Sequence, residues 1–206
     1  MGRRALTTKG LLNKKFKYVL FRDEWAGLIG RRVELRGTWI IFGESGNGKT
    51  RFSLALAKYL MGYEKVLYNS MEEGASLTMQ KAVKDLEFPL DSRSFLITDN
   101  EDLEEMKKRL KKKRPPRIII LDSLQYSMMS KEEYKELKEK HRNKLFIFIS
   151  HAEGNKPLGS VAEFIQYDSH VKIRVEGYKA FAKSRYGGAT PYTIWEKGAK
   201  KYYEKK

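Results

Sequence analysis

Short apolar runs alternate with amphipathic stretches over most of the chain. The apolar runs that we expect to form strands lie at residues 38–42, 65–69, 94–98, 117–123 and 144–150. Between them, helix-forming stretches lie at residues 51–60, 76–86, 101–112 and 130–140. Strands that alternate with helices in this way are typical of a parallel sheet covered on both faces. The sequence therefore predicts an α/β fold with a mostly parallel central sheet.

The N-terminal part of the chain departs from this alternation. Residues 1–17 are basic and show no clear periodicity, so we expect a flexible tail followed by a single domain at residues 18–206. Asp23 is a candidate N-cap for a short helix after the tail. Trp25 lies at helical spacing in this segment, and we expect it to pack against the core.

Two further local patterns complete the predicted elements. Asn100 is a candidate N-cap for the helix at residues 101–112. Near the C-terminus, alternating apolar residues predict antiparallel strands that turn at residues 176–177. We expect two short strands to follow, at residues 192–195 and 201–203.

The chain is strongly basic, with a formal net charge of +16 over 206 residues. A field of this sign raises the local concentration of polyanions, nucleic acid first among them. Charge alone does not separate DNA from RNA, an acidic protein or an anionic membrane surface. The absence of cysteine excludes a disulfide scaffold and a zinc ribbon. No apolar run reaches membrane-spanning length and no secretion signal is visible, so we expect a cytoplasmic protein without a membrane partner.

The sequence GESGNGKT at residues 43–50 stands between an apolar run and a helix-forming run. Its glycines allow the backbone to turn so that N–H groups point at phosphate oxygens, and the next helix adds its positive end. Lys49 would reach the β- and γ-phosphates, and Thr50 would bind Mg²⁺. The alternative is a glycine-rich surface turn. The candidate nucleotide-binding residues are Gly43, Glu44, Ser45, Gly46, Asn47, Gly48, Lys49, Thr50 and Arg51.

An acid stands near the end of the apolar run at residues 117–123. The aliphatic residues fit a strand buried on both faces, and Asp122 at its carboxyl tip would hold the water shell of Mg²⁺ beside Thr50. In the alternative interpretation, Asp122 caps the next helix. Paired with the glycine-rich loop, this acid predicts ATP and Mg²⁺ as the cofactors. Trp25 could then stack on the adenine base instead of packing in the core.

The densest basic run, KKRLKKKRPP at residues 107–116, ends one predicted helix and precedes a buried strand. It could contact nucleic acid, or it could be the solvated end of that helix, where basic residues are common. Both interpretations stay open. Because the run lies at the start of the next strand, we expect it to face away from the nucleotide site, which lies beyond the carboxyl ends of the strands.

These motifs resemble the RecA-like ATPase superfamily, particularly the bacterial RadA-type DNA repair ATPases and the core of DnaB-type helicases. The resemblance covers roughly residues 21–196 and includes three more sequences, at residues 68–73, 149–160 and 178–188. It implies a RecA-like P-loop NTPase fold with an antiparallel C-terminal extension. In YNSMEE, the first of these sequences, it implies that Glu72 polarises the attacking water, with Glu73 as the less favoured candidate. Two solvated acids at the start of a helix are the alternative.

The second sequence, ISHAEGNKPLGS, resembles the superfamily's strand-tip sensor followed by a flexible loop. The resemblance implies that His151 donates a hydrogen bond to the γ-phosphate and moves when it leaves. It also implies that residues 152–161 form a DNA-facing loop, although Lys156 is the only base there. A histidine at a strand end can also be structural.

The third sequence contains KSRYG, which resembles the Lys-Asn-Arg-Phe-Gly element of RadA-type proteins. The resemblance implies that Lys183 and Arg185 reach the ATP of a neighbouring subunit, where positive charge favours phosphoryl transfer. Such a role requires a homo-oligomeric ring or filament. Basic residues on an edge strand also guard against aggregation, which is the alternative.

The resemblance stops at the core, because the zinc module and accessory domains of those families have no counterpart here. We therefore expect a bare motor core. The favoured function is a Mg²⁺-dependent ATPase that binds DNA, single-stranded DNA first, and works as a multimer in recombination, repair or replication. The alternative is a nucleotide-dependent switch or assembly ATPase that acts on a protein partner without DNA. The fold alone does not decide between them.

Overall fold

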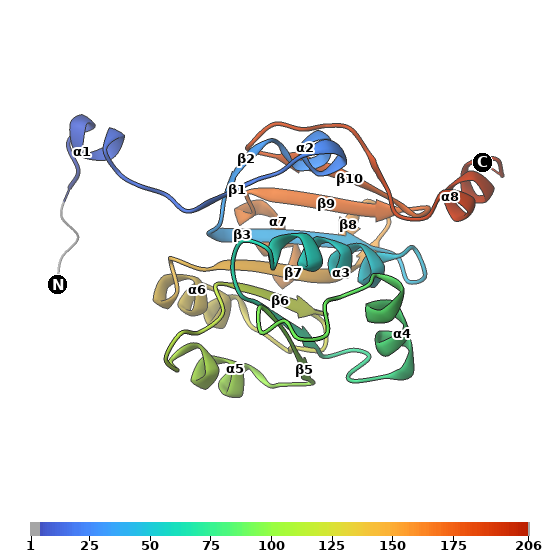
Figure 1. The fold of residues 1–206 in the computed structure, drawn as a ribbon, viewed down its shortest axis with the longest axis horizontal. Coiled ribbons are helices and arrows are strands. Elements are labelled where there is room, and N and C mark those ends of the chain that lie inside the picture. Colours follow the sequence, from blue (N-terminus) through green and yellow to red (C-terminus); the bar gives the residue numbers. More distant parts are fainter. Residues whose placement is uncertain (1–4, 206) are drawn as a thin grey trace.

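A single large sheet forms the centre of the molecule (Figure 1). The computed structural model describes residues 5–205, so the first four residues of the predicted tail and Lys206 lie outside the described range. The strands of the sheet are β3 (Gly37–Gly43), β4 (Val66–Ser70), β5 (Phe95–Asp99), β6 (Ile118–Asp122), β7 (Leu145–Glu153), β8 (Lys156–Pro157), β9 (Val171–Glu176), β10 (Lys179–Ser184) and β11 (Tyr192–Thr193).

The order of these strands confirms the predicted fold class. It reads β11-β10-β9-β3-β7-β6-β4-β5, with β8 paired to β7. Neighbouring strands from β9 to β5 pair in parallel, whereas β8, β10 and β11 are joined by antiparallel pairs. The parallel strands therefore all end at one edge of the sheet, which we call the carboxyl edge, and all begin at the opposite amino edge.

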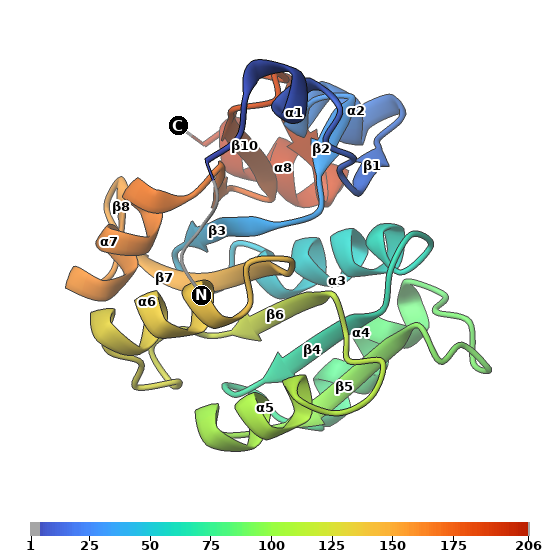
Figure 2. The same ribbon diagram turned by 90° about the vertical axis from the view of Figure 1, so that its left-hand side faces the viewer.

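Helices cover both faces of the sheet (Figure 2). On one face, α3 (Lys49–Leu60) and α4 (Leu77–Asp85) contribute to one buried apolar cluster. On the other, α5 (Leu103–Leu110), α6 (Lys131–Lys140) and α7 (Ser160–Asp168) contribute to a second cluster. Strand β6 feeds both, since Ile118 and Ile120 belong to the first cluster and Ile119 and Leu121 to the second. This double burial explains why β6 reads as a continuous apolar run instead of an alternating one.

A small subsheet packs against the first face. It consists of β1 (Tyr18–Leu20) and β2 (Arg32–Glu34), which pair antiparallel and are joined through α2 (Asp23–Ile29). Trp25 of α2 lies among aromatic rings, with its ring centroid 4.6 Å from Tyr192 and 5.6 Å from Phe52. These contacts place Trp25 in the packing of the domain.

Two predicted helix caps are wrong. Arg22, without a side-chain hydrogen bond, occupies the N-cap of α2, and Asp23 is the first helical residue. Helix α5 begins after Asp102, whose side chain accepts a hydrogen bond from the Glu105 N–H while Glu105 reaches back to the Asp102 backbone. Asn100 has a φ of 50° and therefore lies outside the extended conformation that an N-cap adopts. The capping box two residues later sets the start of the helix.

The last predicted strand is also wrong, because residues 201–203 belong to α8 (Glu196–Tyr203). Trp195, Gly198, Ala199 and Tyr202 recur at helical spacing, and this periodicity outweighs the strand preference of consecutive tyrosines. Similarly, residues 152–161 are not a loop throughout. Most of them form the β7–β8 hairpin, and the segment then enters α7, a helix that the sequence analysis missed.

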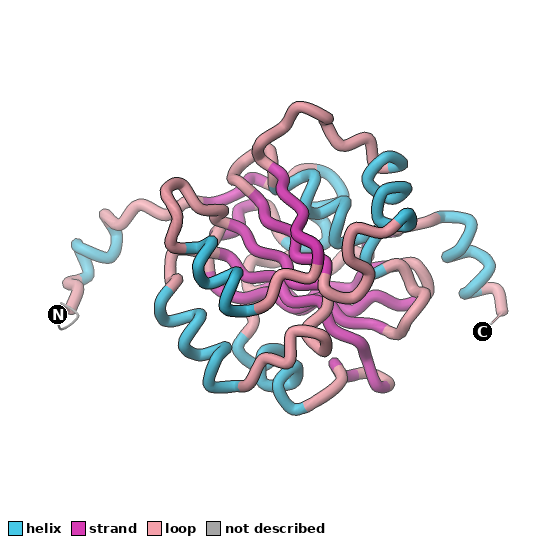
Figure 3. Tube along the Cα trace, turned by 90° about the horizontal axis from the view of Figure 1, so that it is seen from below, coloured by secondary structure: helices cyan, strands magenta, loops and turns pink. Residues whose placement is uncertain are grey.

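The terminal segments lie at opposite ends of the molecule, as Figure 3 shows. Within the predicted flexible tail, the structure contains one short helix, α1 (Thr8–Leu12), capped by the Thr7 side chain and burying no residue. Among the described residues, no helix is long and apolar enough to cross a membrane.

Candidate functional site

The glycine-rich loop connects β3 to α3 at the carboxyl edge, in the predicted strand–loop–helix order. Gly43 is closely packed, since a Cβ at this position would lie 2.2 Å from the Val175 carbonyl oxygen. Gly46 and Gly48 have φ angles of 76° and 94°, which other L-residues rarely adopt. The loop therefore depends on glycine at each of these three positions, for packing at the first and for backbone conformation at the other two.

A hairpin holds the loop from the side. The turn between β9 and β10 consists of Gly177 and Tyr178, whose φ angles of 52° and 59° fit the type I′ geometry of a two-residue hairpin. The Gly177 N–H donates a hydrogen bond of 2.7 Å to Oδ1 of Asn47. The side chain of Asn47 also donates to the Ser45 carbonyl, at 3.3 Å. Asn47 thus ties the loop both to itself and to the hairpin.

Lys49 is a buried cation at the start of α3, with only 8% of its surface exposed. Its Nζ donates a 3.0 Å hydrogen bond to the Glu44 carbonyl within the loop. Burial lowers the pKa of Lys49, whereas the charges of Glu72, Asp122 and Glu44 oppose that shift. Three acids from separate parts of the carboxyl edge therefore surround the same ammonium group.

Asp122 lies at the carboxyl tip of β6 and is 5% exposed. Burial is the main cause that raises its pKa to about 6, with the charges of Glu72 and Glu73 acting in the same direction. A hydrogen bond from Tyr68 and the charge of Lys49 act the other way. The protein's own groups offset only part of the cost of burying the charged carboxylate of Asp122. A cation bound nearby would favour the ionised form.

Tyr68 is a site residue that the sequence analysis missed as such. Its buried hydroxyl donates to Oδ2 of Asp122 and lies 2.9 Å from Oγ of Ser53, which in turn bonds to the Thr50 carbonyl at 2.9 Å. Burial and the Asp122 charge both raise the pKa of Tyr68, so the phenol remains a donor. This chain connects the first turn of α3 with the tip of β6. A phenolic residue inside an apolar strand, facing the loop helix, was the available signal.

The donor set fits a hydrated Mg²⁺ bound together with phosphate. Thr50 and Asp122 supply a hydroxyl and a carboxylate, and the described residues contain no cluster of three or more His, Cys, Asp or Glu side chains that could hold a metal alone. Mg²⁺ is usually bound in this way, through one or two protein ligands, substrate phosphates and water. The hydroxyls of Ser70 and Ser123, on residues beside the tips of β4 and β6, are buried without a protein partner. These orphaned hydroxyls indicate that the site is built for additional polar ligands.

The two candidate catalytic acids point to different partners. Nε2 of His151 lies 3.3 Å from Oε2 of Glu72. Glu73 instead accepts a 3.0 Å hydrogen bond from Thr78, close to the start of α4. The structure therefore brings Glu72 and His151 together beside Lys49 and Asp122, whereas Glu73 interacts with the following helix.

Gln125 supports the strand tip that carries His151, and the sequence analysis did not identify it. Its Oε1 accepts a 3.1 Å hydrogen bond from the His151 N–H. Its Nε2 donates to Ser150 and to the Leu158 carbonyl, each at 2.9 Å. Gln125 therefore links the segment after β6 to both strands of the β7–β8 hairpin.

Lys183 and Arg185 lie apart from the loop of their own chain. Strand β10 runs away from the Gly177 turn, and Lys183 is four residues beyond Lys179, the first residue of the strand, which corresponds to about 13 Å. The Arg185 N–H donates to the His170 carbonyl, next to the start of β9. Lys183 therefore lies level with the middle of β3, since it pairs with Lys172 and Lys172 pairs with Ile40, whereas Arg185 lies nearer the amino edge.

Arg51, the last candidate of the loop, lies on the outer surface of α3. One of its guanidinium nitrogens is 3.9 Å from Asp85 of α4, and its side chain is 46% exposed. A small cavity of about 170 Å³ adjoins the loop instead, between Gly43, Asn47, Arg174 and Tyr202. Tyr202 belongs to α8, so the C-terminal helix also contributes to the surroundings of the loop.

Comparison with known proteins supports the fold assignment. The flagellar accessory protein FlaH from Methanocaldococcus jannaschii matches with a TM-score of 0.62 and 19% identity, over 88% of this chain and 96% of that chain. A KaiC-like protein from Pyrococcus horikoshii matches with a TM-score of 0.64 and 15% identity, over 86% and 94% of the two chains. No protein-family model and no curated protein sequence matches. The chain has the RecA-like α/β fold, and the narrower resemblance to RadA-type and DnaB-type proteins stays a prediction.

Proposed function

We propose that this chain is a Mg²⁺-dependent ATPase of the RecA-like type that binds single-stranded DNA and works as a multimer in recombination, repair or replication. The observation that carries the proposal is the convergence at the carboxyl edge of one buried lysine with acids from β6 and from the segment after β4. A structural glycine turn has no need for such a set of charges.

The phosphates of ATP would bind along the loop. Backbone N–H groups and the positive end of α3 attract the phosphate oxygens, and Lys49 exchanges its bond to the Glu44 carbonyl for one to the β- and γ-phosphates. Thr50 and Asp122 would hold Mg²⁺, which neutralises charge that develops on the phosphates. Tyr68 keeps the Asp122 carboxylate oriented through its hydroxyl.

Glu72 is the residue that we assign to the attacking water. It is close enough to the phosphate loop to act on Lys49 electrostatically, and His151 lies within 3.3 Å of its carboxylate. A γ-phosphate that accepts a hydrogen bond from His151 would compete with Glu72 for that imidazole. Binding of ATP would then release Glu72 for the water, and hydrolysis would restore the pair.

The expected multimer rests on the role that we assign to Lys183 and Arg185. Lys183 lies on β10 and Arg185 just after it, outside the phosphate loop of their own chain, and we propose that both act on ATP across a subunit interface. Positive charge supplied in trans stabilises the transition state of phosphoryl transfer.

A second function, a nucleotide-dependent switch that acts on a protein partner without DNA, is favoured by the β7–β8 hairpin. This predicted DNA-facing segment carries Lys156 next to Glu153, so it has almost no net charge. The similar FlaH protein is described as a flagellar accessory protein, and that description names no nucleic acid.

The test is a titration with labelled ATP and Mg²⁺, followed by ATP turnover with and without a DNA oligonucleotide. Lys49→Ala should lower ATP affinity by about 100-fold or more, because it removes a charged hydrogen-bond donor to phosphate. Lys144→Ala is the matched control for the ATP titration, since Lys144 is similarly buried and donates to a backbone carbonyl at the amino edge.

Each outcome decides one part of the proposal. Absence of saturable ATP uptake, or equal uptake by Lys49→Ala, would contradict the ATPase. ATP turnover that DNA does not stimulate, together with absence of salt-sensitive DNA binding, would leave the ATPase but favour the protein-directed switch.

A further inference from the structure

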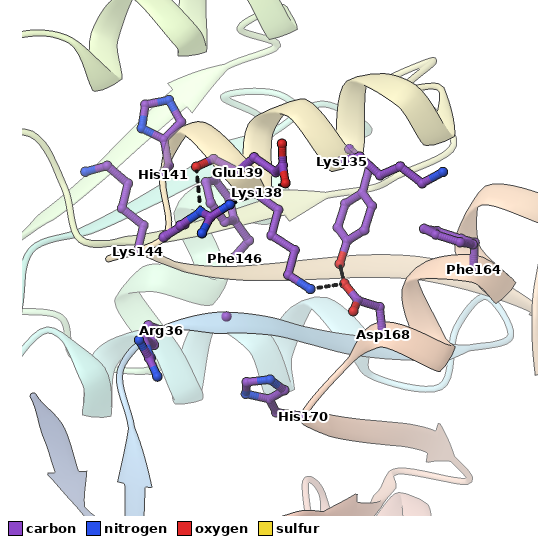
Figure 4. A pocket seen from close by; sticks show the side chains of 13 residues that line it. Arg36, Lys135, Lys138, Glu139, His141, Lys144, Phe146, Phe164, Asp168 and His170 are labelled. Carbon is purple, nitrogen blue, oxygen red and sulfur yellow. Dashed lines mark hydrogen bonds and ion pairs between the residues drawn. The ribbon is translucent and has the colours of Figure 1, made fainter. Parts of the chain in front are cut away.

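A large cavity lies away from the phosphate loop. It has a volume of about 630 Å³ and opens at the amino edge, between α6, α7 and the starts of β3 and β7 (Figure 4). Its walls carry five lysines or arginines and two acids, with aromatic rings between them. The cations are Arg36, Lys135, Lys138, Arg142 and Lys144.

The two acids in the wall serve to fix neighbouring groups. Asp168 accepts hydrogen bonds from Lys138 and Tyr134, as the dashed lines in Figure 4 show. Glu139 lies 3.3 Å from a guanidinium nitrogen of Arg142. Lys135 and Lys144 have no carboxylate partner among the described residues, so the wall keeps a net positive charge.

The basic run of the sequence continues this surface. Nζ of Lys144 donates a 2.6 Å hydrogen bond to the Pro116 carbonyl, and Arg117 donates to the Leu35 carbonyl at 3.3 Å. Residues 111–117 contain five lysines and arginines and no acid, and none of them forms an ion pair within the described part of the chain. We call residues 111–117 together with the cavity the basic edge.

The pKa values of the two histidines in the cavity wall are lowered in part by the same cations. Burial lowers the pKa of His141, and the charges of Lys144, Lys140 and Lys111 add to the shift. Burial also lowers the pKa of His170, with Arg185 and Lys138 acting in the same direction. Cations from α6 and from the segments after α5, before β7 and after β10 therefore act on one small region.

We propose that the basic edge binds the phosphate backbone of single-stranded nucleic acid, with an unpaired base entering the cavity. The cations are spread over several elements, which suits an extended polyanion better than one phosphate group. Phe164 offers a partly exposed aromatic wall on which a base can stack once Lys135, whose Nζ lies 5.1 Å from the ring centroid, turns to a phosphate. Stacked and paired bases of a duplex could not enter such a cavity.

This inference rests on the proposed function, because it gives the place where the DNA would bind. That place lies at the opposite edge of the sheet from the proposed ATP site. It also replaces the near-neutral β7–β8 hairpin as the expected contact. Binding at the basic edge therefore does not require an intact phosphate loop, and the two functions can be tested separately.

The test compares two triple variants that lose the same charge. Lys111→Ala/Lys135→Ala/Arg142→Ala removes exposed cations of the basic edge. Lys84→Ala/Lys197→Ala/Lys201→Ala removes exposed cations of α4 and α8 and is the control. Binding of a fluorescent single-stranded oligonucleotide is measured at several salt concentrations, and ATP uptake is measured in the same preparations to verify folding.

We expect the basic-edge variant to bind at least about tenfold more weakly at about 0.1 M salt, and the control to change less than about twofold. The slope of log affinity against log salt should fall by about 2, since each lost phosphate contact accounts for roughly 0.7 on single strands. Replacement of the same three residues by the other basic residue, Lys by Arg and Arg by Lys, should retain most of the binding.

Three results would overturn the inference. If both triple variants bind like the wild-type protein, DNA binds elsewhere and the proposed function stands. If the wild-type protein takes up ATP but no oligonucleotide, the DNA part of the function fails together with the basic edge. If vesicles containing phosphatidylserine bind with the same dependence on these residues while the oligonucleotide does not, the surface recognises a membrane.

Discussion

Lys49 and Lys144 are two buried lysines at opposite edges of one sheet, and their surroundings differ in sign. Each is less than 10% exposed, and each Nζ donates to a backbone carbonyl. Burial lowers the pKa of both. Three acids oppose this shift at Lys49, whereas at Lys144 the charge of Arg117 reinforces it and only Glu64 opposes it. The acids at the carboxyl edge therefore favour binding of a cation together with phosphate, whereas the cations at the amino edge favour binding of an anion.

Helix polarity explains much of this separation. In a parallel sheet with crossover helices, helices start near the carboxyl edge and end near the amino edge. Helices α5 and α6 follow the dipole preference, with glutamates in their first turns and lysines or arginines in their last. The same rule that stabilises each helix thus gathers bases at the amino edge. It leaves that edge suited to a polyanion.

The largest effect should come from Glu72→Gln at the carboxyl edge. Loss of the base that polarises water should lower ATP turnover by roughly 10²–10⁴-fold while ATP uptake and oligonucleotide binding are retained. The matched control is Glu73→Gln, since Glu73 contacts Thr78 instead of His151. Steady-state turnover and ATP titration measure the two quantities. A larger loss of ATP turnover in Glu73→Gln than in Glu72→Gln would make Glu73 the catalytic acid. Unchanged turnover in both variants would favour a binding switch.

An intermediate effect is expected for Asn47→Ala. This change removes the acceptor of the Gly177 N–H and should cost about 1 kcal/mol, which corresponds to about fivefold in ATP affinity. Calorimetric titration with ATP and Mg²⁺ is the measurement. Asn143→Ala, an exposed change at the amino edge, should leave ATP affinity unaltered. An unaltered affinity in Asn47→Ala as well would show that the hairpin does not support the loop.

The smallest effect should appear at the amino edge in Asp168→Asn. Burial acts to raise the pKa of Asp168, but hydrogen bonds from Lys138 and Tyr134 outweigh it and lower the pKa below 3.8. The carboxylate therefore stabilises the fold above about pH 4, and this contribution is lost as the pH falls through the lowered pKa. We expect a loss of up to about 1 kcal/mol at pH 7, reduced by partial exposure of the pair.

Urea unfolding at pH 7 and at about pH 3 checks this prediction. The difference between Asp168→Asn and the wild-type protein should shrink at the lower pH, whereas Asp91→Asn, an exposed change, should show little difference at either. A difference that grows on acidification would have the wrong sign and would exclude a stabilising carboxylate at this position. Because the change removes one negative charge from the basic edge, oligonucleotide affinity should rise slightly.

Local sequence patterns were sufficient for the central elements and for the strand–loop–helix order around the glycine-rich loop. The loop residues from Gly43 to Thr50 are consecutive, so their chemistry is readable without a fold. The wrong predictions at Asn100 and at residues 201–203 also have local causes. At Asn100 the capping box of Asp102 and Glu105 sets the start of the helix instead, and at residues 201–203 the helical spacing of apolar residues outweighs the strand preference of tyrosine. By contrast, Tyr68 and Gln125 act through partners distant in sequence, which spacing alone does not reveal.

What the sequence by itself determined is the order of the central strands and helices, the place of the glycine-rich loop between a strand and a helix, and the excess of positive charge, because each depends on residue type and short-range spacing. Only the tertiary structure decided which distant groups meet. It joined Asn47 to Gly177, 130 positions later, set Glu72 rather than Glu73 against His151, and brought the basic run beside the cavity of α6 and α7. The physical reason is strand order: inserting β7 between β3 and β6 fixes every neighbour at both edges, and that order is a property of packing over the whole sheet.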